Sequence, residues 1–193
     1  MLSRSLLVVL LLAAADASVL LRSFGDRRQG DQVYAVLSAC LRMRGGASEE
    51  HTFAMLKPDV ASNEVKVEAI KELIKDAGLR IERMERTRLS KPACKVFYEE
   101  HKDRDFFDDL VKFMTSGPVL KMELVGPNAI KQWRSILGPT NSLKARDEAP
   151  DSIRAKFGTD GQQNAAHGSD APESAARELE LMFQGGGWPL NKK

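Results

Sequence analysis

Residues 162–183, QQNAAHGSDAPESAARELELMF, place His167 directly before Gly168 and a strong signal for the start of a helix. A neutral imidazole can attack phosphorus when its other ring nitrogen is held by a hydrogen-bond acceptor. Gly168 would let a ligand approach the ring, and the N-terminus of the following helix favours a nearby anion. A packed histidine would fit the same pattern, so the chemistry of His167 depends on the residues that accompany it.

Groups that could bind phosphate are scattered along the chain. The sequence contains no GxxxxGK[ST] loop, no GxSxG motif and no GxGxxG after a strand, so a glycine-rich phosphate cradle is excluded. Phosphates would have to be bound by separate side chains. The candidates at the ends of elements or in loops are Lys57, Arg134, Thr140 and Arg154.

Composition excludes several other classes of protein. The chain has 193 residues, 42% of them hydrophobic, and a formal net charge of +2. This near-neutral balance gives no basis for nucleic-acid binding. Two cysteines, Cys40 and Cys94, cannot form a disulfide scaffold, and no Cys/His cluster has the spacing of a zinc site.

The first 49 residues differ in kind from the rest. Residues 1–17 combine Arg4, an apolar run over 6–15 and the small-residue pattern Ala15-Asp16-Ala17, which is typical of a signal peptide. The apolar run is too short for a stable membrane span, which needs about 20 residues.

Residues 18–49 are rich in arginine and suit a transit peptide or a disordered leader. Two organellar destinations fit: a plastid reached through the secretory route, or a mitochondrion. A secreted protein with a disordered arm is a further alternative. We expect the folded domain over residues 50–184 and a short flexible tail over 185–193.

The periodicity of apolar residues predicts an α+β fold with a mostly antiparallel sheet. The expected strands cover residues 53–56, 79–89 with a bulge, 119–126, and a very short one near 164–167. Helices are expected over 64–77, 90–100, 104–116 and 128–137, as a turn around 152–157, and after Asp170. Residues 139–152 are expected to form a long polar loop.

Two finer expectations concern polar residues. Lys121 and Glu123 alternate with apolar residues, which predicts a half-buried strand with these two side chains on its open face. Asp170 and Glu173 have the spacing of a capping box for the last helix.

Five blocks of sequence resemble, in order, those of the nucleoside diphosphate kinase family: FAMLKPD, FYEEHKDRDFFDDLVKFMTSGPV, WRSILGPTN, PDSIRAKFG and NAAHGSDAPESAARE. Together they span roughly residues 51–183. The resemblance implies a ferredoxin-like βαββαβ sandwich with a four-stranded antiparallel sheet. It also implies an enzyme that transfers the γ-phosphoryl group of a nucleoside triphosphate, usually ATP, to a nucleoside diphosphate. Mg²⁺ would be carried by the nucleotide phosphates, and a homo-oligomer is implied.

The resemblance also implies roles for individual residues. His167 would carry the phosphoryl group in a ping-pong mechanism, Glu178 would orient its imidazole, and Ser169 belongs to the same motif. The remaining residues would surround the nucleotide: Lys57 and Asn164 near the ribose and the transferred phosphate, Tyr98 beside the histidine, Arg134, Thr140 and Arg154 around the phosphates, and Phe106 and Leu110 under the base.

The chain also departs from the common family pattern. VASNEVKVEAI replaces a glycine-rich segment after the first KPD, and the segment between Thr140 and Arg154 is about three residues longer than usual. The longer segment leaves a second hypothesis open, in which a weakly active or inactive member acts as a binding or assembly partner in an organelle.

Overall fold

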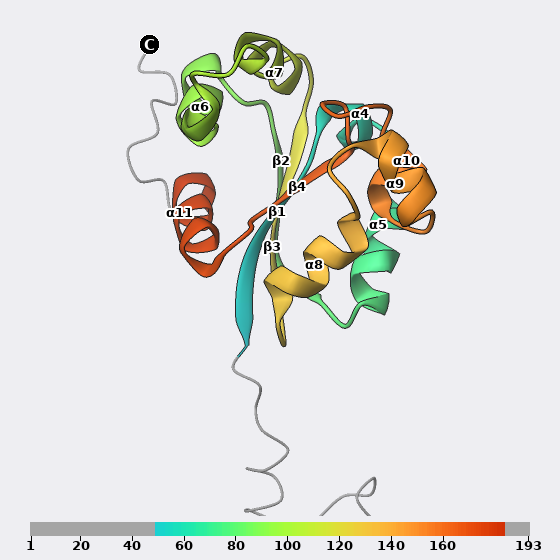
Figure 1. Cartoon of the computed structure of the whole chain (residues 1–193). Helices are drawn as coiled ribbons and strands as arrows, with labels where there is room; N and C mark the ends of the chain where they lie inside the picture. The colour runs from blue at the N-terminus through green and yellow to red at the C-terminus, as the bar shows by residue number, and fades with distance from the viewer. Residues whose placement is uncertain (1–48, 184–193) are drawn as a thin grey trace, which may run out of the picture. The chain divides into compact units, whose positions relative to one another are not determined.

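A computed structural model describes residues 49–183 of the chain. Its four strands are β1 (Glu50–Leu56), β2 (Arg80–Thr87), β3 (Val119–Gly126) and β4 (Ala166–Gly168). They form one sheet in the order β2-β3-β1-β4, and every neighbouring pair is antiparallel (Figure 1). This arrangement confirms the α+β, ferredoxin-like fold.

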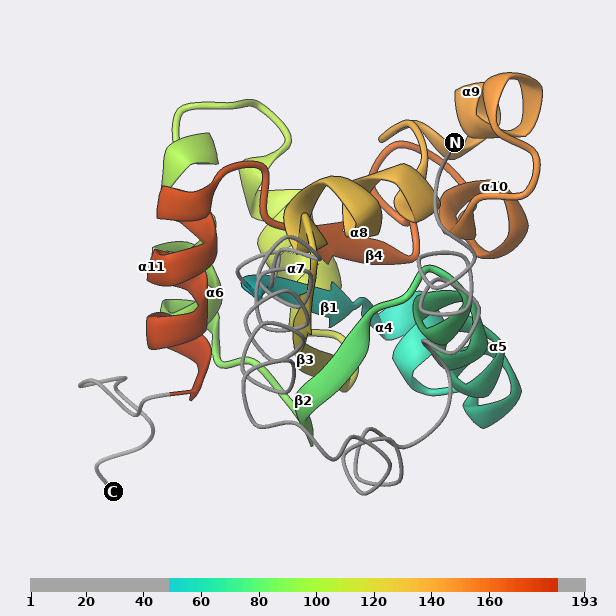
Figure 2. The ribbon, with the colours of Figure 1, turned by 90° about the horizontal axis from the view of Figure 1, so that it is seen from below.

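The helices cover both faces of the sheet (Figures 1 and 2). Their bounds are α4 (Pro58–Ala61), α5 (Glu64–Asp76), α6 (Lys91–Phe97), α7 (Phe107–Met114), α8 (Ala129–Leu137), α9 (Ser142–Glu148), α10 (Ile153–Phe157) and α11 (Pro172–Phe183), with a 3₁₀ turn η1 (Glu99–His101) between α6 and α7. Helices α5 and α8 lie on one face, and α6, α7 and α11 lie on the other. None of the helices within residues 49–183 is long and apolar enough to cross a membrane.

Each face of the sheet has its own apolar core. The core under α5 and α8 is built around Ile70, Met122 and Trp133, all fully buried. The core under α6, α7 and α11 includes Phe53 and Phe97. Because alternate residues of β1 point to opposite faces, this one strand supplies side chains to both cores.

The prediction for β3 was wrong about its open face. Every residue of β3 is buried, including Lys121 and Glu123. The strand lies between β2 and β1 with helices on both sides, so neither face is left to solvent. Lys121 donates to the carbonyl of Met182 at 2.6 Å and pairs with Glu85 at 3.0 Å. The two polar side chains are therefore tied down inside the fold rather than solvated.

The long polar loop predicted after Gly138 contains a helix, α9. The side chain of Asn141 accepts hydrogen bonds from the amides of Leu143 and Lys144, which begins the helix. The helix has no stripe of large apolar residues that would have predicted it, and its one large apolar side chain, Leu143, is exposed. Arg146 then donates to the carbonyl of Gly158 at 2.8 Å, which joins α9 to the end of α10.

Smaller expectations had mixed outcomes. The predicted bulge in β2 is confirmed as a register shift between Ile81 and Arg83. The predicted capping box is wrong, because α11 begins at Pro172 and Ser174 makes the bonds instead. Its hydroxyl donates to Asp170 and accepts the amide of Ala171. The predicted signal peptide (1–17), nearly all of the leader (18–49) and the tail (185–193) lie outside the described residues.

Candidate active site

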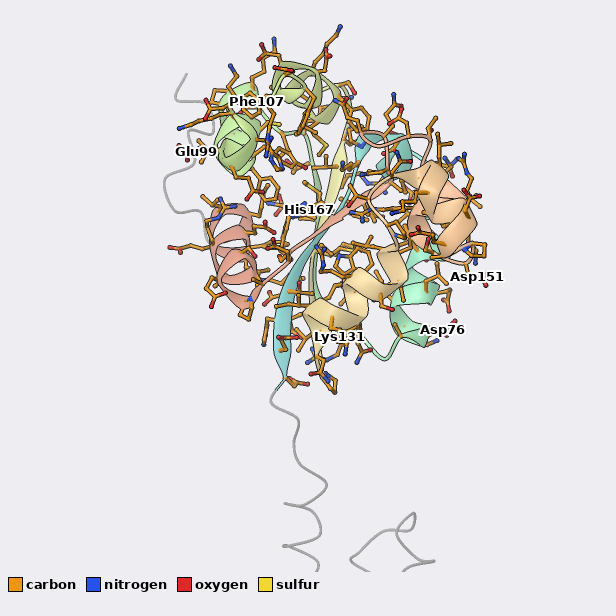
Figure 3. All side chains as sticks on the ribbon, viewed as in Figure 1. Asp76, Glu99, Phe107, Lys131, Asp151 and His167 are labelled. Carbon is orange, nitrogen blue, oxygen red and sulfur yellow. The ribbon has the colours of Figure 1, made fainter. Side chains whose placement is uncertain are left out.

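His167 lies in the middle of β4, beside α11 (Figure 3). It pairs with Met55 of β1, and it therefore points to the same face of the sheet as Met55, toward α6 and α11. The strand is only 3 residues long, and the same pairing continues at Ala54 and Leu56. This short ladder fixes where the imidazole stands.

A carboxylate on α11 holds one nitrogen of the His167 ring. Nε2 lies 2.9 Å from Oε2 of Glu178, whose side chain is only 4% exposed. The hydroxyl of Ser169 donates to the same oxygen at 2.7 Å. An ionised carboxylate only accepts hydrogen bonds, so Nε2 must carry a proton here, and in the neutral imidazole Nδ1 keeps the lone pair. No residue within 49–183 hydrogen-bonds to Nδ1.

Aromatic side chains surround the ring on the remaining sides. Phe97 packs edge to face with His167 at 5.1 Å between centroids, and Tyr98 does so at 6.2 Å. Phe53 lies at 6.0 Å. The His167 side chain is 20% exposed, so the imidazole is fixed in place yet still accessible.

The role predicted for Gly168, which was to let a ligand approach the His167 ring, is wrong. A Cβ at this position would come within 2.4 Å of Nε1 of Trp133, on the face of the sheet opposite the His167 ring. The same Nε1 donates to the carbonyl of His167 at 3.1 Å. The glycine therefore makes room for the Trp133 indole, and not for a ligand.

Lys57 immediately follows β1 and is buried, with 6% of its surface exposed. Its ammonium group donates to the carbonyl of Gln162 at 3.0 Å. Burial, followed by the nearby charge of Arg154, lowers the pKa of Lys57 from 10.5 to about 8. An anion beside Lys57 would relieve both effects.

Two arginines belong to the same positive region. Arg154, on α10, is buried and donates to the carbonyls of Gly138 at 2.8 Å and Ala166 at 3.2 Å. Burial, followed by the charge of Arg134, lowers its pKa to about 10. Arg134 itself is exposed at the end of α8 and borders an open hollow of about 360 Å³ together with Lys131 and Asp170. Arg154 thus lies close enough to both Lys57 and Arg134 for the like charges to repel.

Several buried polar atoms in this region have no hydrogen-bond partner among the described residues. They are Nε of Arg154, Oδ1 of Asn164 and Oη of Tyr98. The amide nitrogen of Asn164, in contrast, donates to the carbonyls of Thr140 and Gly161, both at 2.9 Å. Buried polar groups are normally satisfied, so these atoms have hydrogen-bonding capacity that the described residues do not use.

The two residues expected under a base are placed differently. Phe106 is 48% exposed just before α7, with its ring 5.8 Å from that of His101. His101 in turn stacks on Tyr98 at 6.2 Å, so a row of rings leads from Phe106 toward His167. Leu110 is buried in the core beneath α7 and presents little open surface.

Comparison with known proteins shows to which family the chain belongs. The family model described as nucleoside diphosphate kinase matches residues 50–186. The chain belongs to the nucleoside diphosphate kinase family. A probable nucleoside diphosphate kinase 5 of Arabidopsis thaliana is 45% identical over 130 residues, which cover 67% of this chain and 90% of that protein.

A solved structure and a longer relative extend this comparison. The crystal structure of the Aquifex aeolicus nucleoside diphosphate kinase has 42% identity and a TM-score of 0.67, covering 72% of this chain and 97% of that one. Nucleoside diphosphate kinase homolog 7 of Rattus norvegicus is 47% identical over 148 residues. Those residues cover 76% of this chain but span only 37% of the rat protein.

Sequence reasoning missed two residues that shape the site. Trp133 supports the backbone of His167, and its only signal was its place in the apolar stripe of the helix over 128–137. Asp59 accepts the amide of Ala165 at 3.0 Å, two residues before His167. A carboxylate directly after the Lys57-Pro58 break was a visible signal, since polar side chains at strand ends often face a site.

We predict that Gly168→Ala destabilises the protein by about 1–3 kcal/mol, because the new Cβ would overlap the Trp133 indole. Gly161→Ala is the matched control, since the nearest atom to a Cβ there lies at 4.0 Å. Urea denaturation of both variants measures the difference. Equal unfolding midpoints for the two variants would contradict the packing described here.

The pKa of Lys57 predicts a pH-dependent stability. Between pH 8 and 10.5 the unfolded chain binds a proton that the folded chain does not, so Lys57 makes stability rise with pH across this window. In Lys57→Met that rise is absent. The variant should exceed the wild type in free energy of unfolding most at pH 7, by on the order of 3 kcal/mol, and the gap should shrink toward pH 10.5.

Denaturation curves at several pH values test this, with Lys95→Met on the exposed surface of α6 as a control for lost positive charge. A gap between wild type and Lys57→Met that stays constant from pH 7 to 10.5 would refute the lowered pKa.

Proposed function

We propose that the protein is a nucleoside diphosphate kinase that moves the γ-phosphoryl group of a nucleoside triphosphate, usually ATP, onto a nucleoside diphosphate. The observation that carries this proposal is the state of the His167 ring. Its Nε2 is bonded to Glu178 and its Nδ1 has no partner among the described residues. A ring held in this way presents one lone pair as a nucleophile.

The transfer would proceed in two matched steps. In the first, Nδ1 of His167 attacks the γ-phosphorus, the N–P bond forms, the bridging P–O bond breaks, and the nucleoside diphosphate leaves. In the second, a terminal phosphate oxygen of another nucleoside diphosphate attacks the phosphohistidine and restores the free imidazole. Glu178 stabilises the positive charge that the ring gains while it carries the phosphoryl group, and Ser169 keeps Glu178 in place.

The positive region supports binding of a polyphosphate. Lys57 and Arg154 are buried with lowered pKa values, and Arg134 lies near Arg154. A triphosphate would offset their mutual repulsion, and phosphoryl transfer depends mainly on such charge neutralisation and positioning. The partnerless atoms of Asn164 and Tyr98 would meet the polar part of the nucleotide, with Thr140 at the phosphates.

Mg²⁺ would enter bound to the nucleotide phosphates, where it neutralises their charge. Residues 49–183 hold no cluster of three or more His, Cys, Asp or Glu side chains suited to a metal ion. In the proposed complex the chain's own cations, Lys57, Arg134 and Arg154, would contact the phosphate oxygens.

The exposed ring of Phe106 suits a base held by stacking. A flat aromatic face binds any base without reading its edge, so the proposal includes acceptance of both purines and pyrimidines. Leu110 would contribute only from beneath, because it is buried in the core.

We expect wild-type protein, mixed with γ-labelled ATP and Mg²⁺, to form an acid-labile phosphoenzyme. Adding an unlabelled nucleoside diphosphate should remove the label from the protein completely and transfer it to the nucleotide. His167→Ala should take up no label. His51→Ala is the matched control, because His51 bonds to Glu123 on another part of the sheet and should leave labelling intact.

A folded wild-type protein that binds ATP but takes up no label would contradict the kinase. The alternative, a family member that acts as a binding or assembly partner, would then be favoured. The folded helix α9, in the segment that is longer than in common members, is the feature that would then be examined as a binding surface.

A further inference from the structure

A strained turn leads from Asn164 to His167. Ala165 has a φ of 68°, and the amide of Ala166 donates to the carbonyl of Asn164 at 2.8 Å. A hydrogen bond that spans two residues around a positive φ defines the rare, strained form of the γ-turn. A residue with a Cβ adopts it only when the surrounding structure enforces it. The strain lies directly between two residues of the candidate site.

The segment from Lys57 to Asp59 binds both remaining polar groups of Ala165. The backbone amide of Lys57 donates to the carbonyl of Ala165 at 2.9 Å. The amide of Ala165 donates to Oδ2 of Asp59 at 3.0 Å. The γ-turn is therefore held from both sides by one short segment at the end of β1.

That segment is itself rigid. The carbonyl of Lys57 accepts the amides of Val60 at 3.0 Å and Ala61 at 2.8 Å, and both of these side chains are fully buried. Pro58 begins α4 and fixes its own φ. Burial raises the pKa of Asp59, and its Oδ1 has no hydrogen-bond partner among residues 49–183. The carboxylate is thus buried at a cost, and the hydrogen bond that it makes to another residue is the one from the amide of Ala165.

We propose that Asp59 is a positioning residue for phosphotransfer, which acts by accepting the amide of Ala165 and so holding the strained turn that sets His167 relative to Asn164. Asp59 makes no contact with the imidazole in this arrangement. Its effect passes through Ala165 to the start of β4. We call the hydrogen bond from the amide of Ala165 to Asp59 the clamp. Only the kinetic part of the test rests on the proposed function, because the clamp can be measured without nucleotide.

A competing account would use the charge of Asp59 alone. Its carboxylate raises the pKa of Lys57 against the effect of burial, so its loss could also weaken phosphate binding. Asp59→Asn removes the charge and keeps an oxygen that can accept the amide. Asp59→Ala removes both. Ala165→Gly removes the Cβ that makes the turn costly, so the turn no longer needs a strong clamp.

The experiment measures the first-order rate constant for phosphorylation of His167 at saturating ATP. We expect Asp59→Ala to lower it by about tenfold or more, which corresponds to about 1.4 kcal/mol, and Asp59→Asn to stay within about threefold of wild type. In the Ala165→Gly background, Asp59→Ala should cost less than about threefold. An Asp59→Asn variant as slow as Asp59→Ala, or no rescue by glycine, would overturn the proposal.

Folding is followed in the same set of variants. If Asp59→Ala does not fold, the double variant Asp59→Ala/Ala165→Gly should fold, because the strain is gone. If the double variant also fails to fold, Asp59 acts on something other than the turn and the proposal is wrong.

Hydrogen exchange separates this proposal from the proposed function. The amide of Ala165 should be protected in wild type and Asp59→Asn, and should exchange at least about tenfold faster in folded Asp59→Ala. A wild-type protein without phosphotransfer would end the kinase proposal, and the exchange data would still decide on the clamp. An Ala165 amide that exchanges freely in wild type would refute the clamp even in an active kinase.

Discussion

The pairing of the short strand β4 with β1 is the constraint on which the candidate site depends. It places His167 opposite Met55 and turns the ring toward α11, where Glu178 meets Nε2. The two faces of β4 contact different parts of the protein. The imidazole of His167 faces α11, while Gly168 lies against Trp133 on the other side. A slip of one residue would exchange these faces and bury the imidazole under α8.

The site is also a balance of buried charges. Lys57 and Arg154 are held inside the fold at the expense of their charged forms, and Arg134 adds to the repulsion. Such an arrangement favours a polyanion without any glycine-rich loop, because the ligand itself supplies the missing negative charge.

Sequence patterns predicted the parts that depend on local periodicity or on ordered motifs. The strands, the bulge in β2 and the position of His167 at a very short strand follow from the residues themselves. The burial of Lys121 could not be predicted, because it depends on which strands flank β3 in the sheet. Helix α9 was missed because its signal is a single capping residue, Asn141, without an apolar stripe.

In the candidate site, too, some features could be predicted from the sequence and others depend on contacts between distant segments. Lys57, Arg134 and Arg154 were predicted to bind phosphate from their positions at the ends of elements and from the resemblance, and the structure places Arg154 near each of the other two. The contact of Trp133 with His167 and that of Asp59 with Ala165 join segments far apart in the chain, which no local pattern encodes. In the proposed mechanism, Glu178 holds Nε2 of His167 and leaves Nδ1 as the nucleophile. NMR of the phosphoenzyme with ¹⁵N-labelled histidine tests it: a phosphoryl group on Nδ1 is the predicted result, and one on Nε2 would contradict it.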